Sequence, residues 1–372
     1  MTRRLIFRVA MRACAWALLA VSAYWSVRLA WADHLSSGAR LANRERAIVL
    51  APAIAAFHDR LADLRLGMGQ NPLPELIQAA ALEPRNATRY VRLGQQAELA
   101  GEPGLAERSL LSAARHSRLF GPSYLLAQFY FRNRDEASFW RWSREALQRA
   151  YGDVLPLLDL CWRTRPDAQW LTLHVLPERP DIRRQFLVCL TRHGELDAAG
   201  ALAGTLVKGA GPEDQRTLVD YVDAALAAGE TRSALDLWNA LGRRGLHAYQ
   251  PLEAPMLTNA GFGHPPSGAG FDWRLTETPG VDATLGHGQL RLSFSGTQPE
   301  ECKIMWQYAP VIRGERYRVA GHGLVDGLTW HVDGAGRRGD LARVSLVYRR
   351  PLGSPRFEGV VVLSDVRLER SP

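Results

Sequence analysis

The chain has 372 residues, of which 47% are hydrophobic and 23% charged, and its formal net charge is +8. This length exceeds one compact core and predicts at least two domains, while the composition excludes a mainly disordered chain. Lys208 and Lys303 are the two lysines, and the other basic residues are mostly scattered arginines. A phosphate-binding surface instead gathers its lysines and arginines, so the sequence predicts no nucleic-acid partner.

The N-terminus has the pattern of a membrane anchor. Four arginines come first: Arg3, Arg4, Arg8 and Arg12. An apolar run over residues 13–27 follows, and apolar neighbours extend it in both directions towards the roughly 20 residues that cross a bilayer. Aromatic residues typical of membrane interfaces are also present: Trp16, Tyr24, Trp25 and Trp31. Residues 1–32 are therefore predicted to be a basic cytoplasmic tip and a single transmembrane helix.

A cleaved signal peptide is the alternative, because Ala30-Trp31-Ala32 before Asp33 fits the small-x-small cleavage pattern. Arg28 interrupts a region that is usually neutral, and residues 32–35 are expected to open the first helical unit, so the uncleaved anchor is favoured. Both alternatives export residues 33–372. The early arginines hold the N-terminus in the cytoplasm, which predicts a single-pass inner-membrane protein with its bulk on the periplasmic side.

Residues 33–248 have a helical pattern with short breaks at Gly or Pro. A Gly-Glu-x-x-x-Ala turn occurs three times, beginning at Gly101, Gly194 and Gly229, and the last two turns are 35 residues apart. Glycine ends a helix in the left-handed conformation, and glutamate is favourable at the next helix start. Alanine at the fixed offset lets the two helices approach closely. Such pairs bury their apolar stripes by stacking.

These units resemble tetratricopeptide repeats, whose period is about 34 residues. The clearest unit is 85–115. In its first helix Tyr90, Leu93 and Ala97 are expected to face the core, and in its second helix Ala106, Leu110 and Ala113 are. The stretch 151–180 is degenerate. The resemblance implies an α-solenoid that binds a protein partner on its concave face, although repeat stacks also serve as spacers.

An aromatic cluster supplies the candidate protein-binding residues: Tyr124, Tyr130, Trp140 and Trp142. They could line a peptide-binding groove. The alternative is that they form the core between repeats, with the polar tips of Tyr and Trp at its rim.

Residues 249–372 have a different composition, with frequent Gly and Pro and few helix formers. Hydrophobic residues alternate with polar ones in five segments: 289–294, 303–308, 316–320, 342–348 and 359–368. This period-two pattern with Gly and Pro between the segments predicts an antiparallel β-sandwich.

The β-domain resembles jelly-roll carbohydrate-binding modules. Residues 311–317, with Gly314 and Tyr317, match the turn before a strand in that group, and residues 359–368 match its closing strand, which pairs with the opening strand. Ser364 stands where the pattern has an Asp, so the structural calcium of that corner is not expected. The short stretch 333–340 lacks the additional strand of a complete jelly roll, which predicts a reduced one.

Sugars bind to aromatic faces flanked by polar groups. The candidate carbohydrate-binding residues are Trp273, Trp306, Tyr308, Trp330 and Tyr348. The alternative is that the tryptophans within alternating strands are core residues.

The sequence predicts no catalytic site, cofactor or metal. It contains no GxSxG, HExxH or P-loop motif and no CxxC pair. The spacing of the β-domain histidines does not suggest a shared metal site: His264, His287, His322 and His331. Cys161 and Cys189 could pair in an oxidising compartment or be buried thiols.

The whole arrangement resembles a group of exported repeat proteins associated with exopolysaccharide or cell-surface glycan production. The resemblance implies a non-catalytic envelope scaffold whose helices hold a protein and whose β-domain touches glycan or another protein, in exopolysaccharide assembly or export. Two alternatives stay open: a glycan-modifying enzyme with an unrecognised site, and a purely structural assembly factor of the envelope.

Overall fold

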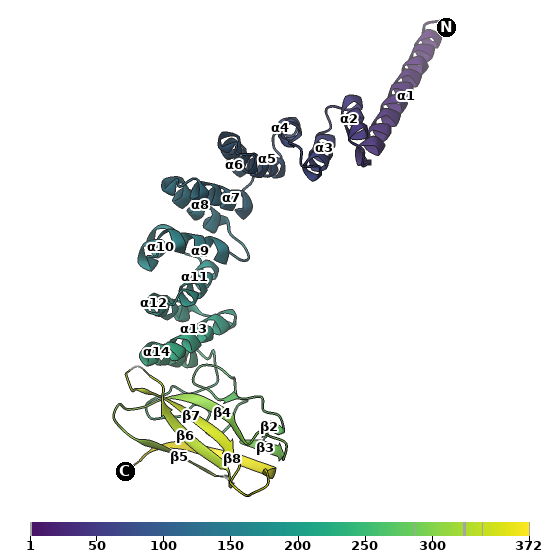
Figure 1. Ribbon diagram of the computed structural model, residues 1–372. Helices are drawn as coiled ribbons and strands as arrows, with labels where there is room; N and C mark the ends of the chain where they lie inside the picture. The colour runs from purple at the N-terminus through teal and green to yellow at the C-terminus, as the bar shows by residue number, and fades with distance from the viewer. Residues whose placement is uncertain (1, 287, 323–324, 337, 372) are drawn as a thin grey trace. The chain divides into compact units, whose positions relative to one another are not determined.

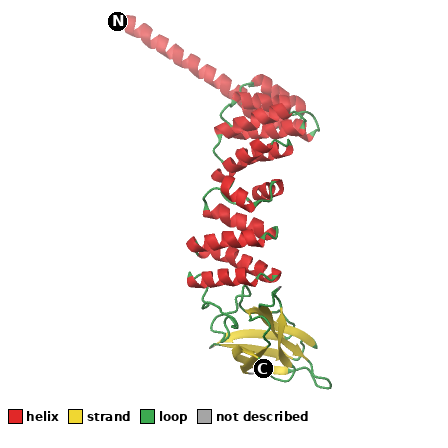
Figure 2. Cartoon of the chain, turned by 90° about the vertical axis from the view of Figure 1, so that its left-hand side faces the viewer, coloured by secondary structure: helices red, strands yellow, loops and turns green. Residues whose placement is uncertain are grey.

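The computed structural model describes residues 2–286, 288–322, 325–336 and 338–371. Over these residues the chain forms fourteen α-helices and then eight β-strands (Figure 1), which confirms the predicted fold class. Helices and strands occupy separate parts of the chain (Figure 2). Two compact units are present, Met1–Gly152 with α1–α8 and Asp153–Pro372 with α9–α14 and the strands. The domain boundaries proposed from the sequence, at residues 32 and 248, stay predictions.

Helix α1 (Thr2–Ser37) is continuous and contains a segment, Met11–Ser37, that is long and apolar enough to cross a membrane. The side chains of Arg3, Arg4 and Arg8 lie outside the described ones, whereas residues 11–27 are exposed throughout. At 1.5 Å per residue, residues 11–27 before Arg28 span about 26 Å, a little less than the roughly 30 Å of a hydrocarbon core.

The C-terminal end of α1 belongs to the folded part of the first unit. Arg28 Nε donates to the carbonyl oxygen of Leu50 at 2.8 Å. Ala32 is fully buried in a cluster with Ala47 and Phe57. Residues 32–35 therefore continue α1 and do not open a new helix as the sequence suggested.

The first unit continues with three helix pairs after α2. The helices are α2 (Leu41–Leu50), α3 (Ala55–Gly67), α4 (Leu73–Leu82), α5 (Ala87–Leu99), α6 (Pro103–His116), α7 (Phe120–Arg132) and α8 (Glu136–Arg149). The pairs α3–α4, α5–α6 and α7–α8 pack side by side (Figure 1). In the clearest predicted unit, the buried residues of α5 and α6 include Leu93, Ala97, Ala106, Leu110 and Ala113, as expected.

The second unit begins with the degenerate stretch. Its helices are α9 (Leu155–Thr164), α10 (Ala168–His174), α11 (Pro180–Arg192), α12 (Leu196–Leu206), α13 (Gln215–Ala228) and α14 (Thr231–Arg243), with 3-10 turns η1 (Val207–Gly209) and η2 (Pro212–Asp214). Helix α10 has only 7 residues. This short helix accounts for the poor match of residues 151–180 to the repeat pattern.

The three Gly-Glu turns adopt the predicted geometry. Gly101, Gly194 and Gly229 have φ of 77°, 78° and 77°, in the left-handed region. The glutamate after each glycine is the N-cap residue of the next helix. The alanine of each turn is fully buried: Ala106, Ala199 and Ala234. The chain therefore forms tetratricopeptide-like helix pairs by the mechanism that the spacing indicated.

The C-terminal strands form two antiparallel four-stranded sheets. The strands are β1 (Arg274–Leu275), β2 (Val281–Gly286), β3 (Gln289–Ser295), β4 (Glu301–Pro310), β5 (Tyr317–His322), β6 (Leu328–Gly334), β7 (Leu341–Arg349) and β8 (Glu358–Arg370). The sheet orders are β1-β4-β7-β6 and β2-β3-β8-β5. One hydrophobic cluster draws residues from both sheets, including Leu292, Met305, Leu346 and Val361. This packing confirms the sandwich.

The two jelly-roll motifs fall at a turn and at the last strand. Gly314 has φ 84°, and the Ile312 N–H donates to the Tyr317 hydroxyl at 3.0 Å just before β5. Strand β8 pairs with β3 and β5, and a hydrogen bond of 3.0 Å from Val366 N to Ala260 O ties it to the opening segment. Strands β6 and β7 pair directly across the short stretch 333–340. The jelly-roll identity stays a prediction.

The last helix pair packs against the β-sandwich within the second unit. Trp238 on α14 is 2% exposed and lies between the rings of His247, Tyr249 and Phe271, with centroid separations of 4.3, 5.7 and 6.1 Å. Asp223 on α13 accepts from Gly270 N at 2.8 Å and forms an ion pair with Arg274. Thr231 donates to Asp340 at 2.8 Å.

Candidate functional site

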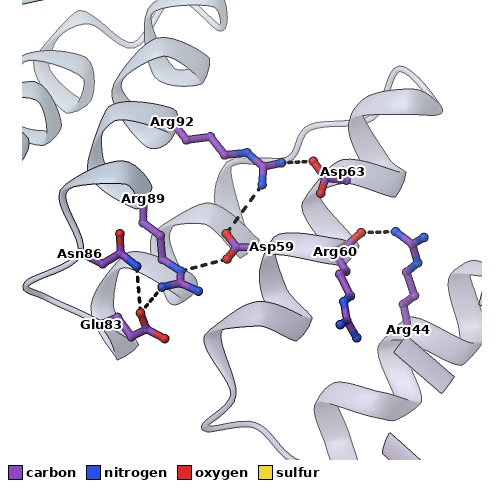
Figure 3. A network of polar contacts seen from close by, with 8 residues as sticks. All are labelled: Arg44, Asp59, Arg60, Asp63, Glu83, Asn86, Arg89 and Arg92. Carbon is purple, nitrogen blue, oxygen red and sulfur yellow. Dashed lines mark hydrogen bonds and ion pairs between the residues drawn. The ribbon is translucent and has the colours of Figure 1, made fainter. Parts of the chain in front are cut away.

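The first helices of successive pairs are joined by charged side chains about one repeat apart. Between α3 and α5, Arg89 Nε donates to Asp59 Oδ2 at 2.9 Å, and Arg92 pairs with both Asp59 and Asp63 (Figure 3). Glu83 joins the same network, and the Asn86 amide, with the Arg89 guanidinium, lowers the pKa of Glu83. These charges satisfy one another, so this stretch fixes the register of α3 and α5 and does not offer free ligands.

A groove lies between the next two first helices, α5 and α7. It has a volume of about 430 Å³, and its lining residues are Gln95, Glu98, Leu99, Leu110, Leu125, Gln128 and Arg132. Arg132 donates twice to the carboxylate of Glu98, from Nε at 2.6 Å and from Nη2 at 2.8 Å. Leu99 is 80% exposed at one side. We call these residues the α5–α7 groove.

The α5–α7 groove combines the two chemistries that an extended peptide requires. The amides of Gln95 and Gln128 can each donate and accept hydrogen bonds, as a strand of peptide backbone does. Leu99 and Leu125 offer apolar surface for side chains. Arg132 binds Glu98 through two parallel hydrogen bonds, and the same guanidinium can bind a carboxylate of a partner in place of Glu98. The arrangement is suited to binding an extended segment of polypeptide.

The aromatic residues predicted to bind protein divide into two classes. Tyr130 and Trp140 are each 7% exposed, and their polar tips donate to Glu107 at 2.8 Å and Glu136 at 2.9 Å. Burial raises the pKa of Tyr130, and the Glu107 carboxylate adds to the shift. Tyr130 and Trp140 therefore lie in the core of the helix pairs with their polar tips hydrogen-bonded, as the alternative to a binding groove predicted. Their role in binding stays a prediction.

Tyr124 and Trp142 keep part of their rings exposed. Tyr124 stacks on Phe120 with ring centroids 5.1 Å apart, and Arg141 lies over the Trp142 ring at 5.4 Å. None of the groove residues was a candidate binding residue from the sequence, and Leu110 was expected in the core. Their signal was a stripe on each helix, Gln95-Glu98-Leu99 and Leu125-Gln128-Arg132, at helical spacing.

A second groove of about 460 Å³ lies among α10, α11 and α12 and is mostly apolar. Leu173, Leu190 and Leu202 line it, and Leu173 is 69% exposed. The short α10 leaves this space open because it covers less of α11 and α12 than a full repeat helix would.

Three of the candidate sugar-binding residues lie in or against the sandwich core. Trp273 and Tyr348 are fully buried, and Trp330 packs against Trp273 at 5.7 Å between centroids. Trp273 donates to Asn259 O at 3.2 Å, and the Tyr348 hydroxyl accepts from Phe357 N at 2.9 Å. Fully buried rings leave no face for a sugar in this structure, although glycan binding itself stays untested.

Trp306 and Tyr308 lie on β4 outside the hydrophobic cluster between the sheets, where Trp306 is partly exposed and Tyr308 is 7% exposed. Arg274 lies over both rings, at 4.6 and 5.4 Å from the centroids, and Arg343 does so at 5.0 and 5.5 Å. These are cation–π contacts. A sugar ring that stacked on Trp306 would need to replace a guanidinium, so the five candidates do not form one open platform.

Taken together, these features define a tetratricopeptide-like helical-repeat protein with an N-terminal helix able to cross a membrane and a C-terminal β-sandwich. No known family model matches the chain, and no curated protein matches it. Among solved structures it is similar to YrrB, a TPR protein with an unusual peptide-binding site, at 16% identity and TM-score 0.27 over 57% of this chain and 96% of that one.

Two further solved structures are similar at the same level. PilF of Pseudomonas aeruginosa is 15% identical, with TM-score 0.29 over 60% of this chain and 91% of that one. PilW, a type IV pilus biogenesis factor, is 12% identical, with TM-score 0.27 over 59% and 93%. Similarity at these scores carries no argument about function, which therefore has to come from the groove and the anchor.

Proposed function

We propose that this protein is a non-catalytic scaffold of the cell envelope, anchored by α1, that holds an extended segment of a protein partner in the α5–α7 groove. The groove carries the proposal, because it joins backbone-compatible amides, apolar surface and an exchangeable ion pair on adjacent helices. The exposed apolar α1 supports the anchor. In this proposal α1 crosses the inner membrane once, and residues 33–248 and 249–372 are periplasmic domains.

The β-sandwich is proposed to contact glycan, in exopolysaccharide assembly or export. The support is the resemblance of residues 311–317 and 359–368 to carbohydrate-binding modules. Trp306 and Tyr308, with two arginines beside them, are the site that an anionic sugar would use.

Partner capture tests the scaffold proposal. The full chain, with Gln128 replaced by a photo-crosslinking residue, is expected to yield a discrete crosslinked protein from intact membranes. A Gln95→Ala/Gln128→Ala double variant is expected to lose that partner on co-purification. Gln78→Ala is the matched control, because Gln78 is exposed on α4 outside the groove. Equal capture by the double variant and the control would remove the groove from the proposal.

Retention on immobilised polysaccharide tests the glycan proposal. The full chain is expected to be retained, and Trp306→Ala is expected to weaken retention. No retention of the unmodified chain would remove the glycan contact and leave the scaffold intact. Turnover of the polysaccharide would instead favour the alternative of an enzyme.

A further inference from the structure

Cys189 on α11 and His193, the residue that caps the C-terminus of α11, meet a carboxylate on α9. Cys189 Sγ lies 3.4 Å from Asp159 Oδ1, and His193 Nε2 lies 3.1 Å from the same oxygen. One ligand atom from each residue lies within 4.8 Å of the other two. Cys189 is fully buried, whereas the side chains of His193 and Asp159 are 33% and 37% exposed. The cluster is therefore closed by protein on one side and open to solvent on the other.

These separations are close to those of a tetrahedral zinc site. Bond lengths of 2.3 Å to sulfur and about 2.0–2.1 Å to nitrogen or oxygen put neighbouring ligands about 3.3–3.6 Å apart. The sulfur–oxygen and nitrogen–oxygen pairs already meet this requirement within about 0.2 Å. Side-chain rotation can shorten the distance between Cys189 Sγ and His193 Nε2, because residues four apart lie on the same helix face.

We propose that Asp159, Cys189 and His193 form a binding site for Zn²⁺ or a similar transition-metal ion. A thiolate and a carboxylate neutralise the two positive charges, and borderline-soft N, O and S ligands suit zinc. Three protein ligands leave a fourth position for water. The thiolate is the form of cysteine that binds a metal, so metal binding at Cys189 releases the thiol proton.

The site has a structural reason to exist at this place. Helix α10 has 7 residues and supplies little apolar surface between the first helices α9 and α11. A metal bound to Asp159 on α9, to Cys189 on α11 and to the capping His193 joins these helices directly. The metal would add its binding free energy to the stability of this part of the fold.

Cobalt substitution tests the site in the full chain. The protein is purified in detergent under reducing conditions, stripped with a chelator and titrated with Co²⁺. One equivalent is expected to give a thiolate-to-cobalt charge-transfer band and intense visible bands of tetrahedral geometry, and Zn²⁺ is expected to displace it. Loss of an outer-shell partner lowers metal affinity 10–100-fold, so Cys189→Ser, His193→Ala and Asp159→Asn should each lower zinc affinity about 100-fold or more.

Two variants serve as matched controls. Cys302→Ser removes a half-buried thiol on β4, and His174→Ala removes an exposed histidine on α10; both are expected to bind cobalt normally. Circular dichroism of each apo variant verifies that it is folded. The absence of a charge-transfer band with folded protein overturns the site. A band that survives His193→Ala but is lost in Cys161→Ser also overturns it, because a pair of cysteines would then hold the metal.

Discussion

Gly270 allows the contact between α14 and the β-sandwich to be tested quantitatively. The residue has φ 57°, and a Cβ atom added there would lie 2.1 Å from Cζ3 of Trp238. An L-residue in the left-handed region costs about 1–2 kcal/mol. Non-bonded carbons prefer about 3.5–4.0 Å, and relieving such an overlap in a packed core costs typically 1–3 kcal/mol. Gly270→Ala should therefore weaken this contact by about 2–5 kcal/mol.

Gly268→Ala separates the two contributions. Gly268 has φ 71°, but no atom lies within 4 Å of an added Cβ, so this variant carries the backbone cost alone, about 1–2 kcal/mol. The chain has two compact units, so one unfolding transition would not isolate the contact. Hydrogen exchange measured on peptides from Thr231–Arg243 does isolate it, because it reports local opening.

The expected difference between the two variants is about 1–3 kcal/mol, or roughly 5- to 150-fold in the opening equilibrium of α14. Equal exchange in Gly270→Ala and Gly268→Ala would show that Trp238 moves aside freely. The tight approach inferred from the structure would then be wrong.

Three further predictions follow from local contacts. Burial lowers the pKa of His247 below 6.5, so the unfolded chain takes up the proton first as pH falls below 6.5. The free energy of opening of α14 should then fall by up to about 1.4 kcal/mol per pH unit until the folded pKa is reached. His247→Gln should flatten this pH dependence of hydrogen exchange. Deleting residues 2–27 should release the chain from membranes on fractionation without changing helix content, whereas deleting residues 2–37 should also destabilise α2 and α3, because Ala32 packs there. Thr231→Val should cost about 1 kcal/mol by removing one hydrogen bond to Asp340, measured by the same exchange experiment.

Local chemistry made much of the fold predictable. The Gly-Glu-x-x-x-Ala turns encode a left-handed cap, an N-terminal charge and a close approach within six residues, and all three features occur at Gly101, Gly194 and Gly229. The five alternating segments correspond to β3, β4, β5, β7 and β8. Strands β1, β2 and β6 lie outside the five predicted segments. Strand β1 has only two residues, and β2 alternates in sequence but is largely exposed.

The candidate sites were harder to predict because they depend on residues from different helices. Gln95 and Gln128 have no distinctive pattern on their own helices and line one groove only because the fold brings α5 and α7 together, with Arg132 bonded to Glu98. Cys189 and His193 have a visible helical spacing, but Asp159 is 30 residues from the cysteine. Aromatic side chains were favoured as binding residues since they are large and chemically distinctive. The same size makes their burial strongly favourable, and five of the nine are 0–7% exposed: Tyr130, Trp140, Trp273, Tyr308 and Tyr348.

The contact at α14 also explains why a β-sandwich follows the helix pairs. A stack of repeats buries each apolar stripe against the next pair, so its last pair needs a different cover. On α14 the residue that needs cover is Trp238, and Phe271 from the segment before β1 supplies part of it. Asp223 and Thr231 add polar contacts to Arg274 on β1 and to Asp340 just before β7. The sandwich therefore acts as the C-terminal cap of the repeats, whether or not its outer face binds glycan.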